Sequence, residues 1–194
     1  IIGNRQSQSI GGFFVSLHER NRRRIMSEKR RLLGMTLEEL KGVASEAGLP
    51  GYAAKQIADW LYKKKVTSIA AMTNIAAAKR TLLEESFEVG AVPPSDLMKS
   101  VDGTIKYLYP AGPGNFVESV YIPTEDRATL CVSSQVGCKM NCLFCMTGKQ
   151  GFTKNLSANE ILNQIQSLPE TEELTNIVFM GMGELLDNVD ELFK

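Results

Sequence analysis

Three cysteines stand close together in the second half of the chain, at positions Cys138, Cys142 and Cys145. Their spacing, C-x3-C-x2-C, is typical of ligands to an iron–sulfur cluster, whose irons are held by thiolates. A cubic four-iron cluster has four corners, so three cysteines leave one iron without a protein ligand. We therefore predict a [4Fe-4S] cluster at these cysteines, with one iron open to a small molecule.

Zinc and a disulfide are the alternative explanations for these cysteines. Structural zinc takes four ligands, usually as two closely spaced pairs. The chain offers only Cys131 as a fourth thiol and His18 as its single histidine, and neither completes a familiar zinc pattern. In a reducing compartment, clustered cysteines favour metal over a disulfide.

The composition is that of an ordinary globular protein. The chain has 194 residues, of which 43% are hydrophobic and 23% charged, and its formal net charge is zero. No stretch approaches the roughly 20 apolar residues of a membrane span, and the first residues are too polar for a secretory signal. These features predict a cytoplasmic protein without a membrane partner.

The neutral net charge conceals a basic beginning. Residues 1–31 hold 8 Lys and Arg against 2 Asp and Glu, which leaves 14 against 20 for the remaining chain. We expect residues 1–29 to form a solvated or disordered basic leader, which could also contact phosphates. Met26 within this leader is a candidate translation start.

Residues 30–92 are expected to form a small helical domain. Thr36 and Glu39 form a capping box, and apolar residues follow at helical spacing. Two short helices joined by a tight Gly/Pro turn make a helical hairpin, a unit that can contact RNA but whose apolar stripe can equally be plain core. We predict an accessory domain that contacts RNA. The expected helices span residues 36–47, 52–64 and about 73–88.

Residues 93–127 are expected to hold a linker and a β-hairpin, with strands over 104–109 and 116–122. Strand alternation places Glu118 with Phe116 and Val120. An ionised carboxylate on an apolar face is costly, which would suit Glu118 to accept a proton. The alternative is a face that is open to water.

Residues 128–194 are predicted to begin an α/β barrel. A strand over 128–134 runs into the cysteine motif, and such folds place their chemistry at the carboxyl ends of strands. A helix that starts at Ser157, with Glu160 completing a capping box, leads to a short buried strand over 176–180. The two strands and the helix form a parallel βαβ unit.

The second strand ends in Gly181-Met-Gly-Glu184. Glycines at a strand end let a ligand approach the backbone, and Glu184 could pair with an ammonium group, although the segment can also be an ordinary tight turn. The stretch from 137 to 156 has three lysines and no acid, which favours a polyanionic substrate. These lysines are Lys139, Lys149 and Lys154.

Together these segments resemble the RlmN/Cfr family of radical S-adenosylmethionine (SAM) RNA methyltransferases. The similarity runs from about residue 30 to the end of the chain. The matching stretches lie at 48–62, 118–123, 131–138, 142–152, which includes Phe144 directly before the last cysteine, and 178–184.

The resemblance implies a role for each candidate residue. Cys138, Cys142 and Cys145 bind the [4Fe-4S] cluster, Gly183 and Glu184 contact SAM, and Glu118 accepts a proton. Cys131 partners a second, methyl-carrying cysteine. The implied reaction is methylation of carbon 2 of adenine in ribosomal RNA and transfer RNA, with an electron donor such as a flavodoxin.

Two departures from the family pattern qualify the resemblance. Leu185 stands where the family has proline, and only the first two strands of a six-unit partial (β/α)6 barrel are found. None of the four cysteines corresponds to the methyl-carrying one. We therefore expect an incomplete chain in which residues 30–88 fold alone, residues 128–194 pack loosely or self-associate, and no methyl group is transferred.

Two other functions remain open from the residues alone. One is a non-catalytic RNA-binding remnant whose cysteines hold structural zinc or nothing. The other is a radical SAM enzyme with specificity for carbon 8 of adenine or for another substrate.

Overall fold

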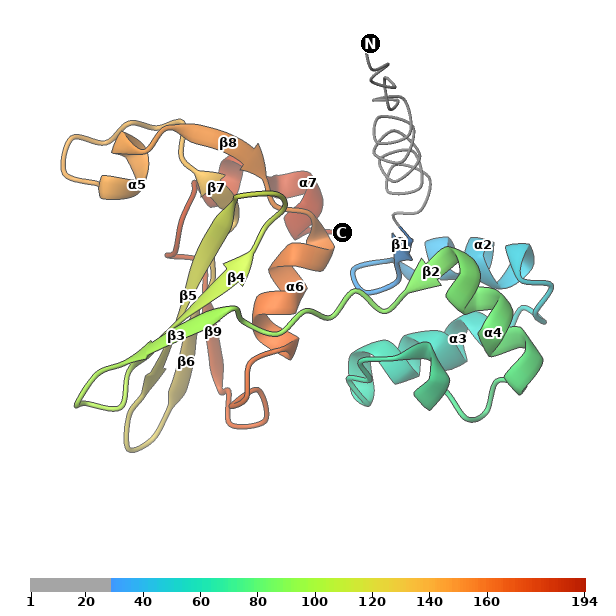
Figure 1. The fold of residues 1–194 in the computed structure, drawn as a ribbon. Coiled ribbons are helices and arrows are strands. Elements are labelled where there is room, and N and C mark those ends of the chain that lie inside the picture. The colour runs from blue at the N-terminus through green and yellow to red at the C-terminus, as the bar shows by residue number, and fades with distance from the viewer. Residues whose placement is uncertain (1–28) are drawn as a thin grey trace, which may run out of the picture.

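The computed structural model describes residues 29–194, so the predicted basic leader lies outside the described residues except for Lys29. These residues form a helical domain and an α/β domain, with helix α6 (Ala158–Gln166) between them (Figure 1). Within residues 29–194, no helix has the length and apolarity that crossing a membrane requires.

The helical domain contains the three predicted helical segments, with two differences in detail. The second segment starts as an α-helix and continues as one π-helical turn. The third starts later than expected, at Ala77, and ends earlier because the chain becomes extended at Phe87. The elements are β1 (Arg30–Arg31), α2 (Leu37–Glu46), α3 (Ala53–Ala58), the π-helix η1 (Asp59–Lys63), the 3-10 helix η2 (Ile69–Ala71), α4 (Ala77–Ser86) and β2 (Phe87–Glu88).

Local sequence signals explain where α2 starts. The Glu39 backbone NH donates to the Thr36 hydroxyl at 3.3 Å, and the Thr36 NH donates to the Glu39 carboxylate at 2.7 Å. This reciprocal capping box, which the sequence predicts, satisfies two amides that have no partner inside the helix.

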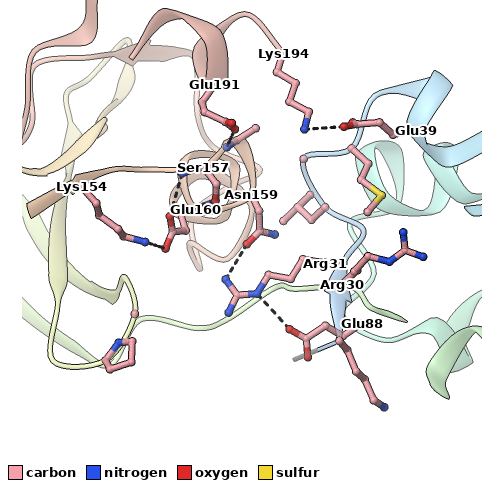
Figure 2. A pocket seen from close by; sticks show the side chains of 17 residues that line it. Arg30, Arg31, Glu39, Glu88, Lys154, Ser157, Asn159, Glu160, Glu191 and Lys194 are labelled. Atoms are coloured by element: carbon pink, nitrogen blue, oxygen red, sulfur yellow. Dashed lines mark hydrogen bonds and ion pairs between the residues drawn. The ribbon is translucent and has the colours of Figure 1, made fainter. Parts of the chain in front are cut away.

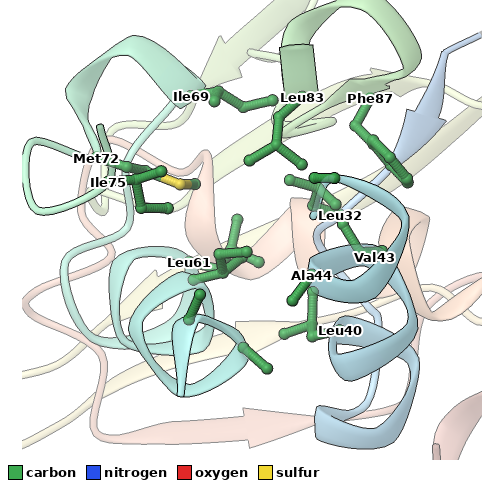
Figure 3. Packing of buried hydrophobic residues seen from close by; sticks show 14 of the residues in the cluster. Leu32, Leu40, Val43, Ala44, Leu61, Ile69, Met72, Ile75, Leu83 and Phe87 are labelled. Atoms are coloured by element: carbon green, nitrogen blue, oxygen red, sulfur yellow. The ribbon is translucent and has the colours of Figure 1, made fainter. Parts of the chain in front are cut away.

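Figure 3 shows how the helices enclose their own hydrophobic core, with Leu40, Leu61 and Leu83 pointing toward one another. Each of these three side chains is fully buried. The two ends of the domain are joined by parallel pairing of β1 with β2, which the sequence does not predict. This pairing closes the domain and places its two ends side by side.

The α/β domain is built on one five-stranded sheet with strand order β3-β4-β5-β6-β9. The predicted hairpin is confirmed as the antiparallel pair β4 and β5, and the predicted βαβ unit as the parallel pair β6 and β9, connected through α6. The prediction that the second strand of this unit is buried is wrong, because β9 is the edge strand of the sheet and is largely exposed. Strand β5 also pairs with β6, so the hairpin and the barrel strands share a sheet. The strands are β3 (Asp96–Lys99), which was not predicted, β4 (Ile105–Pro110), β5 (Phe116–Pro123), β6 (Ala128–Cys131) and β9 (Asn176–Val178).

The sheet has one covered face and one open face. Tyr107, Val117 and Leu130 lie on the covered face, in a core that also contains Ile161 of α6. The opposite face carries Glu118 and Cys131, since the register sets Val120 directly against Cys131. The chain therefore presents the two predicted catalytic side chains on the same, uncovered face.

Short elements surround the carboxyl end of β6. A small antiparallel pair, β7 (Gln135–Gly137) and β8 (Phe152–Asn155), flanks the cysteine loop, which contains the short helix α5 (Met146–Lys149). The segment after β9 forms the 3-10 helix η3 (Leu185–Asp187) and then α7 (Val189–Leu192). Figure 1 shows α5 and its loop projecting beyond the end of the sheet.

Two asparagines of α6 join the domains. The Asn163 amide donates to the Val92 carbonyl at 2.8 Å and accepts from the Val92 NH at 2.7 Å, as a neighbouring strand would. Asn159 donates to the Gly90 carbonyl at 3.2 Å and accepts from Arg31 at 3.2 Å. Both asparagines are buried, so the linker between the domains is fixed against α6.

Candidate functional site

The cysteine loop is closed at its base by β7 and β8. The Cys138 NH donates to the Gly151 carbonyl at 3.0 Å, and the Cys145 NH donates to the Cys142 carbonyl at 3.0 Å. Gly137 has a φ of +75°, and a Cβ there would lie 1.8 Å from the Gly151 oxygen. Only glycine fits at that position, so the residue before the first cysteine is fixed by the loop closure.

The donor chemistry of the loop fits an iron–sulfur cluster. Hydrogen bonds from the Gly148 backbone, and from the backbone and hydroxyl of Thr147, hold the pKa of the Cys145 thiol below its usual range, which favours the thiolate that binds iron. Cys142 is exposed, and Cys138 and Cys145 are half-buried, so all three thiols can be reached.

The three cysteines are not already gathered around one point. Among residues 29–194, no group of three or more His, Cys, Asp or Glu side chains is placed to hold a metal ion. Leu143 and Phe144, between the second and third cysteines, are more than nine-tenths exposed. The assignment of the cluster ligands therefore stays a prediction, and it requires the loop to close around the cluster.

Glu118 lies on a different kind of face from the one predicted. The buried side chains of β5 are Val117, Ser119 and Tyr121, whereas the Glu118 side chain is 44% exposed. Its carboxylate pairs with the Lys106 ammonium at 3.0 Å. The expectation of an apolar surrounding is wrong, and the alternative of an open face is the one that the structure has.

Cys131 ends strand β6 and is half-buried. Burial raises the pKa of its thiol, and a hydrogen bond from the Met180 backbone NH partly opposes that shift. The thiol therefore stays protonated near neutral pH. Because Cys131 shares the open face with Glu118, the two predicted catalytic groups can both face a ligand held against this side of the sheet.

Gly183 and Glu184 follow β9 and contact Gln135, the first residue of β7. Gly183 has a φ of +102°, and a Cβ there would lie 2.6 Å from the Gln135 Cβ. Protein therefore occupies the space on that side of Gly183. The Glu184 carboxylate accepts from the Leu186 NH at 3.1 Å and caps η3. Both residues have a structural role, and SAM contact by them stays a prediction.

The positive rim predicted around the site is largely paired. The Lys139 ammonium lies 2.8 Å from the Asp187 carboxylate, and Lys154 lies 2.6 Å from Glu160. Hydrogen bonds from Lys139 and, to a smaller extent, from the Gln135 amide hold the pKa of the Asp187 carboxyl below its usual range. Only Lys149 of the three rim lysines has no ion pair within the described part of the chain.

Sequence reasoning missed Gln135, which is fully buried between these segments. Its side chain contacts Asn155 at the end of β8, and Glu184 and Asp187 in the segment after β9. A glutamine in the middle of a polar stretch gives no signal of burial, because its partners are brought together only by the fold.

A second concave region lies between the two domains. Figure 2 shows this groove, whose cations are mostly neutralised by neighbouring carboxylates: Arg31 pairs with Glu88, and Lys154 with Glu160. The groove has a volume of about 940 Å³ and contains none of the predicted site residues. It belongs to the contact between domains and not to the cysteine site.

Comparison with known families gives two matches. Residues 31–89 match the family described as ribosomal RNA large subunit methyltransferase N-terminal domain, and residues 132–194 match the radical SAM superfamily. The first match covers the helical domain, and the second begins just after Cys131 and includes the cysteine loop.

Individual relatives agree with these matches. The chain is 82% identical over 169 residues to a probable dual-specificity RNA methyltransferase RlmN of Parabacteroides distasonis, covering 87% of this chain and 49% of that protein. It is 46% identical over 161 residues to the dual-specificity RNA methyltransferase RlmN of Geobacter sulfurreducens, covering 83% of this chain and 45% of the relative. The chain thus spans about half the length of the curated relatives it matches.

A solved structure shares the fold. The crystal structure of a radical SAM methyltransferase from Sphaerobacter thermophilus superposes with a TM-score of 0.76 at 36% identity, covering 84% of this chain and 50% of that one. This likeness confirms the predicted fold class, a helical domain followed by the first strands of a radical SAM barrel. The division at residues 92 and 127 stays a prediction.

Proposed function

The chain belongs to the RlmN family of radical SAM proteins, and we propose on that premise that it supplies the cluster-binding and SAM-binding part of an RNA methyltransferase. The product would be adenine methylated at carbon 2 in ribosomal RNA and transfer RNA. The chain spans about half of its relatives, so the complete reaction also needs residues that correspond to their other half.

One observation carries the proposal. Cys131 and Glu118 lie on the same open face of the sheet, and three exposed or half-exposed cysteines follow Cys131 in one loop. A thiol and a carboxylate thus lie near the end of β6 from which the cysteine loop leaves, and this class of fold places its chemistry at such strand ends, which supports the proposal.

Each side chain has a task in this proposal. Cys138, Cys142 and Cys145 would hold a [4Fe-4S] cluster, which supplies the electron for reductive cleavage of SAM. Glu118, which can reach water and ligand, would accept the proton released from the adenine ring. Cys131, which burial keeps as a thiol at rest, would lose its proton to a base and attack the sulfur of a second cysteine, forming a disulfide and breaking the carbon–sulfur bond that holds the product.

The helical domain would contact the RNA. It carries three consecutive lysines at the end of η1, and the Lys64 ammonium lies 3.5 Å from the centre of the Trp60 ring. Lysines contact phosphates and an aromatic ring can stack on an unpaired base. The proposal places the protein in the cytoplasm, with a flavodoxin-like electron donor.

Anaerobic reconstitution of the chain with iron and sulfide tests the proposal. We expect about four irons per chain and a visible thiolate-to-iron absorption band, both of which Cys138→Ala should abolish. Cys131→Ala is the matched control, since it removes a thiol from the same region and should leave the iron content unchanged. Stoichiometric zinc without iron, or an unchanged band in Cys138→Ala, would instead favour a non-catalytic RNA-binding protein.

A further inference from the structure

We propose that Asp187 is a positioning residue that ties the cysteine loop to the Gly183-Glu184 turn through Lys139 and Gln135. The inference deepens the proposed function and rests on it for its chemical meaning, because the loop would hold the cluster and the turn would hold SAM. The Asp187 carboxylate contacts none of the residues assigned to these two groups, although the Asp187 backbone NH donates to the Glu184 carbonyl at 3.1 Å.

Both side-chain contacts of Asp187 end on the same carboxylate oxygen. Lys139 Nζ lies 2.8 Å from Asp187 Oδ2, and Gln135 Nε2 donates to that oxygen at 2.7 Å. Lys139 directly follows Cys138, the first predicted cluster ligand. One oxygen therefore connects the start of the cysteine loop to strand β7.

Gln135 extends the connection to the turn. Its Oε1 accepts from the Glu184 NH at 2.9 Å, and its Nε2 also donates to Asn155 at 2.9 Å. The side chain is fully buried, and Gly183 packs directly on its Cβ. Because every polar atom of the amide is bonded, Gln135 has one favourable orientation, which fixes the backbone of the Gly183-Glu184 turn.

The cysteine loop has little else to hold it. Within residues 29–194, the hydrogen bonds of segment 138–151 stay inside the loop, apart from that of Lys139 and the β7–β8 pairing at its base. The side chains of Leu143, Phe144 and Met146 are largely exposed, so apolar packing does not anchor it. Without the Lys139–Asp187 pair, the cysteine loop could rotate about its base and change its position relative to the Gly183-Glu184 turn.

Hydrogen exchange of the complete 194-residue chain, measured by mass spectrometry without metal, tests the connection. Asp187→Asn keeps an acceptor for Gln135 but removes the charge that attracts Lys139. We expect exchange in peptides covering 138–150 to accelerate about two- to fivefold, the range of a partly exposed ion pair. Lys139→Met should do the same, and the double variant should add nothing further.

Asp59→Asn is the matched control, because Asp59 forms an ion pair of the same length, 2.8 Å, with Lys63 in the helical domain. It should leave the cysteine loop unchanged. Additive effects of Asp187→Asn and Lys139→Met, or exchange in the loop that neither alters, would overturn the proposal.

A second measurement concerns positioning. On chains reconstituted to equal iron content, the SAM concentration that half-converts the electron paramagnetic resonance signal of the reduced cluster should rise about two- to fivefold in Asp187→Asn. An unchanged midpoint at equal iron content would leave Asp187 a purely structural residue and refute its positioning role. If the unsubstituted chain takes up no iron, the proposed function fails, while the exchange experiment still decides whether the connection exists.

Discussion

Replacing Gly183 by alanine tests whether packing within the protein, and not only contact with a ligand, requires glycine at this position. Gly183 has a φ of +102°, and an added Cβ would lie 2.6 Å from the Gln135 Cβ and 2.8 Å from the Gln135 backbone nitrogen. The second contact is to the backbone, so a side-chain rotation of Gln135 cannot relieve it. We expect Gly183→Ala to destabilise the chain when no SAM is present.

The magnitude has two parts. A left-handed backbone costs an L-residue about 1–2 kcal/mol, and forcing an extra methyl into a packed region costs about 1–3 kcal/mol. The free energy of unfolding should therefore fall by about 2–5 kcal/mol. For a chain of this size, this corresponds to a loss of roughly 4–20 °C in melting temperature.

Two other glycines calibrate each part. Gly114 has a φ of +71° with no atom within 4 Å of its added Cβ, so Gly114→Ala should cost only about 1–2 kcal/mol. Gly42 lies in α2 with the same open space and an ordinary φ, so Gly42→Ala should stabilise the chain by about 0.5–1 kcal/mol. Urea unfolding followed by circular dichroism measures all three. If Gly183→Ala costs no more than Gly114→Ala, the packing argument is wrong.

Three further predictions concern the core, the linker and pH. Leu61→Ala, at a fully buried site, should lower the free energy of unfolding of the helical domain by about 2–5 kcal/mol. Denaturant unfolding monitored by fluorescence of the single tryptophan measures this change. Asn163→Ala leaves both polar groups of Val92 without their partner and should cost about 2–4 kcal/mol, seen as faster hydrogen exchange of the Val92 amide; unchanged exchange there would contradict it. A hydrogen bond to Glu173 and, to a smaller extent, burial raise the pKa of Tyr121 to about 12, above the value near 10 of an unfolded chain. The hydroxyl therefore contributes its full stabilisation of the folded chain below pH 10, and this contribution is lost between pH 10 and about 12. Tyr121→Phe should therefore lose less stability across that window in circular dichroism, and an equal loss would refute the assignment.

Sequence reasoning succeeded where the signal is local. The capping boxes of α2 and α6 are formed by residues three apart, and the structure contains both. The parallel pairing of β1 with β2 was missed because it joins residues 57 positions apart, such as Arg30 and Phe87, in two-residue strands that leave no period to detect. Strand β3 was missed because all four of its residues are exposed.

The misplacement of Glu118 has a specific cause. Both faces of β5 carry apolar residues, and the face with Phe116 and Ile122 looks more hydrophobic in the sequence than the face that contains Ser119. In the structure Ser119 is fully buried, whereas Phe116 and Ile122 are exposed. Alternation alone could assign the two sets of side chains correctly, but not decide which set the helix covers.

The same distinction applies to the candidate site. The spacing of the three cysteines is a property of one short segment, so the cluster prediction can be made from the sequence, and it stays a prediction. The partnership of Gln135 and Asp187 joins residues 52 positions apart, and neither residue type suggests it. The sequence therefore identifies the groups that could react, while the residues that hold those groups in place require the fold.

Helix α6 connects the two halves of the proposed function through neighbouring side chains. Gln164 accepts from the Ser133 NH at 3.0 Å and donates to the Ser133 carbonyl at 2.9 Å, directly before the segment that leads into the cysteine loop. Asn163 makes the same pair of bonds to Val92, at the exit from the helical domain. Each amide replaces a missing strand partner and fixes one residue of backbone in a single orientation. Because both amides are carried on one turn of one helix, the position of the helical domain is set against the same element as the root of the cysteine loop.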